Sequence, residues 1–519
     1  MPNPSTYAAL IHRLGFSADP FAKTNADEEE RLDSYFIEPP FYSTVFGDPN
    51  SPKSTVVFAP RGGGKTALKR KIEMASIASN FLCVTYNTFP TEGITLKQIT
   101  ADYHLQNLLR LVLVAVISEC NGFEVGKINK DDRHFLYLFT KSYLSDIDRN
   151  DLKESIKGVK NMSDKAQEMW NKLLGPVGFV LNGLFTKLGI GAAELKKFEQ
   201  EGGKLGAYRE QFRILRDIAE KLNKAAIYIL IDRVDELSIT GTGSSSYEFI
   251  ASLITDLHLL ELRGYAFKFF LWDMLLEDYR TNARPDRIKY HTLAWTHAQL
   301  KAMISERLKA YSDNRIHSLT QLLGIDVASS EDSVDRLVIY YALGSPRVII
   351  RICKEIIDQQ SEINSNASTL SAEAIYKGIE VFASNFAKDS IDATVLRELK
   401  KVRKVNFTVK HIYSNVFKFS QQAGISKVKQ WQDAGIVEKI GTIKETKGSK
   451  PSNLFSLVNP LAGKYMFPEL SASNFSDRKL RICIPCDVLL IRDWDQNPEG
   501  TCHRCDRTYT LPAKESGSK

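Results

Sequence analysis

A glycine-rich segment of the chain has the residue types and spacing to hold the phosphates of a nucleotide. It consists of Ala59, Pro60, Arg61, Gly62, Gly63, Gly64, Lys65 and Thr66, placed between the apolar run 55–58 and the helix-forming residues 67–70. Glycines allow backbone N–H groups to turn toward a polyphosphate, and the N-terminus of a helix adds partial positive charge. The lysine would reach the β- and γ-phosphates, and the threonine hydroxyl would ligate Mg²⁺. We therefore expect residues 59–66 to bind ATP with Mg²⁺, with Ala59 a permitted variant where this pattern usually opens with glycine.

Three acidic residues could complete the chemistry of this loop. Residues 226–231 form a continuous apolar run, typical of a strand buried on both faces of a parallel sheet, and Asp232, Asp235 and Glu236 follow it. Asp232, at the strand end, is expected to hold Mg²⁺ together with Thr66. Glu236 is the first candidate for the base that orients or deprotonates water, and Asp235 is the second, because spacing alone does not separate them. The alternative interpretation is a strand followed by an acidic helix cap.

Four of the seven cysteines have the spacing of a zinc site. Cys483 and Cys486 form one CxxC pair, and Cys502 and Cys505 form another after fifteen intervening residues. Each pair would aim two sulfurs at one ion, so we expect a closed, structural four-thiolate Zn²⁺ site in a ribbon or knuckle, with a β-hairpin between the pairs. His503 is interpreted as a bystander. Two disulfides are the alternative, and the absence of an export signal disfavours them.

Positive charge is concentrated in one block. Residues 396–465 contain fourteen Lys and Arg against four acids, a net charge of +10, whereas the whole chain carries +7. The remainder is therefore slightly acidic. Such a distribution is the expected footprint of a polyanion-binding surface.

The pattern inside this block resembles a winged helix-turn-helix. Residues 407–416 and 421–435 have helical spacing, the second with Ile425, Val428 and Trp431 facing inward, and a β-hairpin follows over 437–458. The resemblance implies DNA contacts from the second helix and the hairpin tip, made by Lys427, Lys429, Gln430, Lys444, Lys447 and Lys450. A winged helix used only for protein contacts is the alternative.

Further segments predict the sheet that positions these residues. Strands are expected at 81–87, at 266–272 with Asp273 at the tip, and at 290–295, while 105–117 is expected to be a core helix. The apolar stretch 173–190 is interpreted as a buried hairpin or an interaction surface. Neither of these two apolar stretches offers the ~20 uninterrupted apolar residues of a membrane span, and the start of the sequence lacks an export signal. We therefore expect a soluble, cytoplasmic protein without membrane contact.

The predicted fold class is α/β: a P-loop NTPase parallel sheet, AAA+-like, with a helical insertion and a helical lid, followed by a winged helix and a small zinc ribbon. The expected order is an N-terminal segment (1–54), the ATPase core (55–296) with an insertion at about 122–224, the lid (297–395), the winged helix (396–466) and the ribbon (478–512).

Several motifs resemble known ATPase groups. Gly344-Ser345-Pro346-Arg347 resembles the sensor-2 motif of origin-recognition-type AAA+ ATPases, which implies that Arg347 touches the γ-phosphate. The Asp-x-x-Asp-Glu sequence at 232–236 resembles the NACHT branch of STAND ATPases, from which Arg233 departs because a small residue is usual there. Residues 15–21 and 46–49 resemble bacterial ATPases of this broad group, some of them found in anti-phage systems. The resemblance covers about residues 10–465.

Together these features predict an ATP-hydrolysing molecular switch that binds DNA and forms homo-oligomers when loaded with ATP. An arginine from a neighbouring subunit would complete the site, and its candidates are Arg280, Arg284 and Arg287. Since the sequence contains no evident nuclease or protease constellation, an effector activity would belong to a separate protein. The alternative is a signalling scaffold whose winged helix and ribbon bind protein partners.

Overall fold

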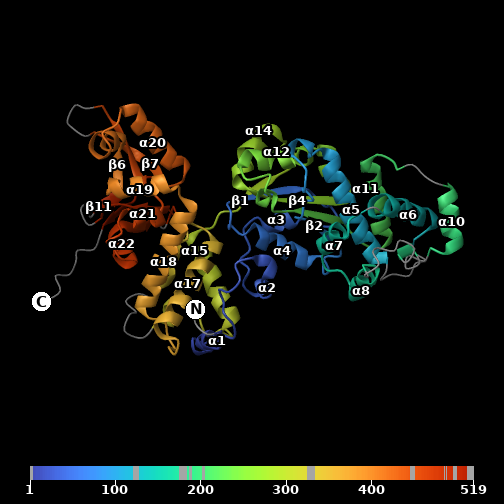
Figure 1. The fold of residues 1–519 in the computed structure, drawn as a ribbon, viewed down its shortest axis with the longest axis horizontal. Helices are drawn as coiled ribbons and strands as arrows, with labels where there is room; N and C mark the ends of the chain where they lie inside the picture. The colour runs from blue at the N-terminus through green and yellow to red at the C-terminus, as the bar shows by residue number, and fades with distance from the viewer. Residues whose placement is uncertain are drawn as a thin grey trace. The chain divides into compact units, whose positions relative to one another are not determined.

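The computed structural model describes residues 4–120, 128–145, 147–174, 184–185, 190–201, 205–323, 333–444, 450–483, 485–486, 488–494 and 499–510. The chain divides into two compact units (Figure 1). One unit comprises Glu38–Ala294, and the other combines Met1–Ile37 with Trp295–Lys519.

A parallel five-stranded sheet forms the centre of the unit 38–294. Its strand order is β2 (Leu82–Tyr86), β3 (Ile227–Ile231), β4 (Tyr265–Trp272), β1 (Thr55–Ala59) and β5 (Tyr290–Thr292). Every residue of β1, β2 and β3 is buried, because helices cover both faces of the sheet (Figure 1). The predicted α/β class with a parallel sheet is therefore confirmed, including each predicted strand.

Two helices pack directly on this sheet. Helix α4 (Lys65–Ala75) follows β1 and packs against β1 and β4. Helix α5 (Ala101–Cys120) packs against β2 and is buried over most of its length, which confirms the predicted core helix. Outside the predicted insertion, the unit also contains α3 (Tyr42–Phe46), α12 (Gly243–Ile254), α13 (Leu257–Leu260) and α14 (Leu276–Asn282).

The predicted insertion is mostly helical over its described residues. Its helices are α6 (Lys130–Leu144), α7 (Arg149–Gly158), α8 (Asp164–Leu173), α10 (Ala192–Glu201) and α11 (Tyr208–Lys221). The segment after α7 joins the edge of the sheet, since Val159 bridges to Val84 and the Lys160 amide donates to the Cys83 carbonyl at 2.9 Å. The stretch predicted as a hairpin or interaction surface, 173–190, lies largely outside the described residues.

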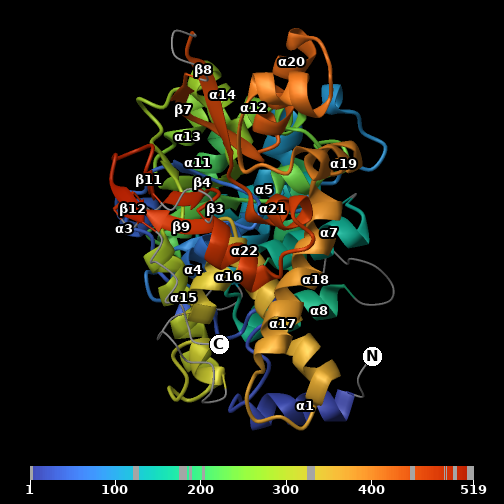
Figure 2. The same ribbon diagram turned by 90° about the vertical axis from the view of Figure 1, so that its left-hand side faces the viewer.

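The second unit begins with a helical part that contains both the start of the chain and the predicted lid. Its helices are α1 (Pro4–Arg13), α2 (Leu32–Tyr35), α15 (His297–Tyr311), α16 (Ser333–Tyr341), α17 (Pro346–Asn364), α18 (Ala372–Ser390) and α19 (Ala393–Val402). Helices α17 and α18 lie side by side (Figures 1 and 2). A buried ion pair between Arg307 and Glu29, at 2.6 Å, fixes the N-terminal residues to α15. The predicted segment 1–54 is consequently divided between the two units.

The winged-helix region contains a three-stranded antiparallel sheet in the order β6 (Asn406–Thr408), β8 (Ser452–Leu457) and β7 (Val437–Ile443). Strands β7 and β8 lie side by side (Figure 2). A π-helical turn (His411–Val416) and α20 (Gln421–Asp433) lie between β6 and β7. The helix predicted from residue 407 was wrong at its start, because Phe407 belongs to β6 and stacks on Phe455 of β8. Val428 and Trp431 are buried as predicted, whereas Ile425 is 42% exposed and its predicted inward position was wrong.

Two short hairpins follow helices α21 (Pro460–Met466) and α22 (Ala472–Lys479). Strands β9 (Leu480–Cys483) and β10 (Val488–Ile491) form the first, and β11 (Glu499–Thr501) and β12 (Thr508–Thr510) form the second. The prediction of one hairpin between the CxxC pairs was wrong, because each pair lies at the turn of its own hairpin. Among the residues that the structure describes, no helix combines the length and the apolar character needed to cross a membrane.

Candidate functional site

The glycine-rich loop leaves β1 and enters α4 at the carboxyl edge of the sheet. Gly62 and Gly64 have φ angles of +77° and +97°, in the left-handed region that residues with a Cβ rarely adopt. A Cβ on Gly63 would lie 2.9 Å from the Pro60 carbonyl oxygen, so this position also requires glycine. Ala59 is a fully buried residue of β1, and its extended conformation accepts a Cβ. The loop therefore has the strand–loop–helix context that phosphate binding requires.

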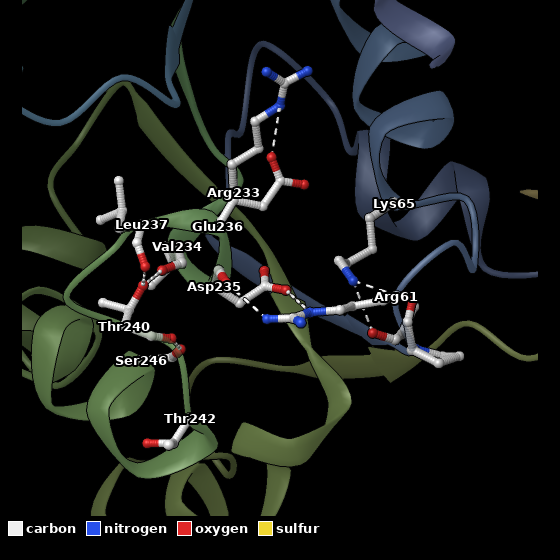
Figure 3. A network of polar contacts seen from close by, with 12 residues as sticks. Arg61, Lys65, Arg233, Val234, Asp235, Glu236, Leu237, Thr240, Thr242 and Ser246 are labelled. Carbon is white, nitrogen blue, oxygen red and sulfur yellow. Dashed lines mark hydrogen bonds and ion pairs between the residues drawn. The ribbon is translucent and has the colours of Figure 1, made fainter. Parts of the chain in front are cut away.

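Lys65 is the first residue of α4, and its side chain is directed back along the loop. Its Nζ donates hydrogen bonds to the carbonyl oxygens of Ala59 at 2.9 Å and Pro60 at 3.2 Å (Figure 3). The ammonium group thus lies within the curve of the loop, where a polyphosphate would also be held.

Thr66 and Asp232 meet at the same edge because β1 and β3 both flank β4 in a parallel sheet. The Thr66 hydroxyl donates to Asp232 Oδ2 at 3.2 Å, and Asp232 is 1% exposed. The other carboxylate oxygen, Oδ1, accepts from the Arg233 amide at 2.9 Å. A hydroxyl and a carboxylate are oxygen ligands of the kind that Mg²⁺ prefers, so these two residues fit the predicted metal role.

Asp235 and Glu236 occupy different environments although they are adjacent. Asp235 is nearly buried, and its Oδ2 and carbonyl oxygen accept from Arg61 Nε at 2.9 Å and Arg61 Nη2 at 2.8 Å. Glu236 is half exposed, with Arg233 as its ion partner at 3.8 Å (Figure 3). The arrangement leaves Glu236 accessible to water and commits Asp235 to Arg61.

Arg61 has a role that the sequence analysis did not identify. Besides its bonds to Asp235, its guanidinium lies 4.3 Å from the centre of the Trp272 ring at the end of β4. Arg61 therefore connects the phosphate loop to the ends of β3 and β4. The sequence does show an arginine in the glycine-rich loop and an acidic turn after β3. It does not show that Arg61 pairs with Asp235, because the two residues are 174 positions apart.

Arg233 adopts a left-handed conformation, with φ of +63°. Such a backbone costs a non-glycine residue on the order of 1 kcal/mol.

The three arginines predicted as candidates to act in trans each have a carboxylate partner. Arg280 pairs with Glu277 at 2.7 Å, Arg284 with Asp286 at 2.8 Å, and Arg287 with Glu261. All three are about half exposed on the unit 38–294. Asp273, directly after β4, begins a short 3-10 turn. Arg347 is an exposed residue of the first turn of α17, in the other unit.

The candidate DNA contacts on α20 are not equivalent. Lys429 and Gln430 are exposed as predicted. Lys427 is only 16% exposed, since it pairs with Glu398 and its Nζ lies 5.7 Å from the centre of the Phe417 ring, so its predicted outward position was wrong. On the hairpin, Lys444 and Lys450 are exposed, and Lys447 lies outside the described residues.

The four cysteines of the two CxxC pairs converge on one point. Their sulfur atoms all lie within 4.8 Å of one another, and Cys483 Sγ is 3.5 Å from Cys505 Sγ. All four are free thiols rather than disulfides. Four thiolates at this separation match the tetrahedral coordination of Zn²⁺, so the residues present fit the predicted ion. The cluster does not include His503.

No protein-family model matches the sequence, and no curated protein matches it either. Among solved structures, the chain is similar to the Aeropyrum pernix ORC1 protein in complex with DNA, at 10% identity over 86% of this chain and 97% of that one, with a TM-score of 0.36. It is also similar to the Aeropyrum pernix ORC2 protein (ADPNP–ADP complexes), at 9% identity over 85% and 98%, with a TM-score of 0.38. A single-substitution variant of Thermotoga maritima RuvB matches at 15% identity over 49% and 91%, with a TM-score of 0.21. The α/β fold with a parallel sheet is established by this chain's own strand order and by the glycine-rich loop between β1 and α4.

Proposed function

We propose that this chain is an ATP-binding and ATP-hydrolysing molecular switch of the AAA+/STAND-like type, which binds DNA and forms homo-oligomers when loaded with ATP. The observation that carries the proposal is the 3.2 Å contact between Thr66 and Asp232, beside Lys65 and a loop whose glycine conformations suit a polyphosphate. This combination supports a nucleotide with its metal ion more directly than any other ligand.

Each residue at the sheet edge has a role in this proposal. The loop amides and Lys65 hold the phosphates, and Thr66 and Asp232 hold Mg²⁺, which neutralises phosphate charge when bound. Glu236 orients the attacking water and accepts its proton, while Arg61 and Asp235 keep the loop against β3. We assign Arg347 to sensing the γ-phosphate, on the strength of its sequence motif alone.

The DNA part of the proposal is supported by charge and exposure. Residues 396–465 carry a net charge of +10, and Lys429, Lys444 and Lys450 within this block are exposed. Exposed lysines on a helix and a hairpin can contact successive backbone phosphates. A separate protein would supply any effector activity, as in a defence or mobile-element system.

The test uses the purified chain with the variants Lys65→Ala and Glu236→Gln. The wild type should hydrolyse ATP and should do so faster with duplex DNA. Lys65→Ala should lose nucleotide binding, whereas Glu236→Gln should retain binding, lose turnover by about 100-fold or more, and accumulate an ATP-bound oligomer. Phosphate release and analytical ultracentrifugation measure these outcomes. The proposal fails if ATP does not bind, or if saturating duplex and single-stranded DNA change neither turnover nor oligomeric state.

A signalling scaffold that binds protein through the winged helix is the second candidate. It is favoured by three large apolar side chains on this region, since Phe419 and Ile443 are each 43% exposed and Ile425 is 42% exposed. The two candidates differ in salt dependence, because binding through several DNA phosphates weakens steeply as salt is added. Binding to an apolar protein surface would change little over the same salt range.

A further inference from the structure

Two opposite charges are buried in α4 directly beside the proposed metal ligands. Lys69 is 0% exposed and Glu73 is 1% exposed, one helical turn apart. Lys69 Nζ lies 3.6 Å from Glu73 Oε1 and also 3.6 Å from Asp232 Oδ2. The ammonium group is therefore located between two buried carboxylates, one of which faces Thr66.

Glu73 is fixed by contacts from several elements. Its Oε1 accepts from the Thr85 hydroxyl of β2 at 2.6 Å, and its Oε2 accepts from Arg70 Nη1 at 3.2 Å. Asn161, from the insertion, donates to the Glu73 backbone carbonyl at 2.5 Å and to Ser76 Oγ at 2.7 Å. The charge pair is thus anchored to α4, to the sheet and to the insertion.

A lysine at this depth requires an explanation, because burying a charge is costly unless it is closely paired. Here the same oxygen of Asp232 faces both the Thr66 hydroxyl and Lys69 Nζ, while its other oxygen faces the Arg233 amide. These contacts hold both oxygens of the carboxylate in fixed directions. Of these three groups, the Lys69 ammonium carries a full positive charge, whereas the Thr66 hydroxyl and the Arg233 amide are neutral.

We infer that Lys69 is a positioning residue for Asp232, with Glu73 as the counter-charge that keeps Lys69 from pairing too strongly with the metal ligand. The inference rests on the proposed Mg²⁺ role of Asp232. Without Lys69, two buried carboxylates face each other and Asp232 loses its fixed orientation. Without the charge on Glu73, Lys69 pairs with Asp232 alone and competes with the ion. Both changes lower Mg²⁺ affinity, and the second effect requires Lys69 to be present.

The experiment compares Lys69→Met, Glu73→Gln, the double variant and Lys71→Met in the full chain. Lys71→Met is the matched control, since it removes a lysine from the same helix at a position that is not fully buried. A fluorescent non-hydrolysable ATP analogue is titrated with Mg²⁺, its affinity is measured in EDTA, and thermal unfolding is recorded. Lys69→Met should raise the half-saturating Mg²⁺ concentration by about 10-fold or more, as expected for loss of a group that orients a metal ligand. Glu73→Gln should also raise it, and Lys71→Met should not.

The double variant distinguishes an electrostatic interaction between Lys69 and Glu73 from independent packing defects at the two positions. Glu73→Gln acts through Lys69, which the double variant lacks. The fold increase in the half-saturating Mg²⁺ concentration should therefore be smaller in the double variant than the product of the two single-variant increases. The inference is overturned if Lys69→Met leaves the Mg²⁺ requirement unchanged, if the rises multiply, or if affinity in EDTA falls as much as affinity with Mg²⁺. If Lys69→Met does not fold, Glu73→Gln decides alone: an unchanged Mg²⁺ requirement overturns the inference, and a raised one supports it. A wild type that binds no nucleotide would instead refute the proposed function.

Discussion

At the scale of single residues, the two adjacent acids after β3 differ in the partners that hold them. Two hydrogen bonds commit Asp235 to Arg61, and Arg61 in turn lies over Trp272. A residue held in this way contributes to the position of the phosphate loop. A general base must instead reach water and change its protonation state, for which the half-exposed Glu236 is better placed.

We therefore predict a separation of effects between these acids. Glu236→Gln should lower turnover by about 100-fold or more and leave nucleotide affinity nearly unchanged. Asp235→Asn should mainly weaken nucleotide binding, and Arg61→Ala should reproduce that defect because it removes the same contact. Steady-state hydrolysis and equilibrium binding of an ATP analogue measure the two quantities. Loss of turnover at normal affinity in Asp235→Asn would assign the base to Asp235 instead.

At the scale of elements, helix α20 carries two lysines that differ in whether an ion pair already compensates their charge. Lys427 pairs with Glu398 and lies near the rings of Phe417 and Phe419, so its charge is already partly compensated. Lys429, on the same helix, is exposed. Only the second lysine is available to replace counterions on DNA.

This difference gives a prediction for DNA binding. Lys429→Ala should lower the slope of log affinity against log salt by about one, and Lys444→Ala together with Lys450→Ala by about two. Lys427→Ala is the control on α20 and should leave the slope nearly unchanged, although it can lower stability. Fluorescence anisotropy with one duplex at several salt concentrations measures the slopes. Equal slopes in all variants would show that these lysines make no phosphate contacts.

Inside the sheet, β4 carries a buried lysine that predicts a pH effect on stability. Lys268 donates to the Lys53 carbonyl at 2.6 Å, and burial lowers its pKa to about 7. Tyr228 and His291 lie nearby, and burial, with Lys289 and Lys268, lowers the pKa of His291. An exposed lysine in the unfolded chain titrates near 10.4, so the unfolded state binds more protons between about pH 7 and pH 10. Lys268 therefore destabilises the fold most below pH 7, and this destabilisation decreases as pH rises toward 10.

Lys268→Met should remove this dependence. Its gain in unfolding free energy over the wild type should be largest at about pH 6 and should shrink by at most about 1.4 kcal/mol per pH unit above pH 7. Chemical denaturation of both proteins at several pH values measures the difference, in which the titrating groups that Lys268 does not influence cancel; His291, which it does influence, is neutral above about pH 8. The exposed neighbour Lys289, replaced by Met, should show no such trend above about pH 8, where His291 is neutral in both states. A constant difference between Lys268→Met and the wild type would mean that Lys268 stays charged in the fold.

The sequence predicts elements better than it predicts their pairing. Apolar runs such as 226–231 identify sheet strands because burial on both faces excludes polar residues. Strand β6 was missed because three residues become a strand only through pairing with β8, about 50 positions later. In the sequence, Lys69 and Glu73 look like exposed charges on a helix. Their burial cannot be predicted from local pattern, because it depends on Thr85 and Asp232 from distant strands.

At the scale of the whole molecule, the candidate site and the cysteine cluster belong to different units. The phosphate loop, Asp232 and Glu236 all lie within residues 38–294, while the four cysteines lie in the unit completed by residues 295–519. The start of the chain belongs to this second unit through Arg307 and Glu29, a pairing across 278 positions that local patterns do not reveal. The residues at the carboxyl edge of the sheet and the four cysteines therefore belong to separate units of the fold.

Zinc removal should affect the second unit and leave nucleotide binding intact. The purified chain should contain about one zinc ion, measured by mass spectrometry of the metal, and Cys502→Ser should lose it. The fully buried Trp494 packs with Cys483 and Cys502, so chelation should expose it and shift its emission to longer wavelength. His503→Ala should retain zinc, since the cysteine cluster does not include this histidine. Because the glycine-rich loop, Asp232 and Glu236 lie in the other unit, a large loss of ATP affinity on chelation would contradict this prediction and would mean that the zinc-binding hairpins support nucleotide binding.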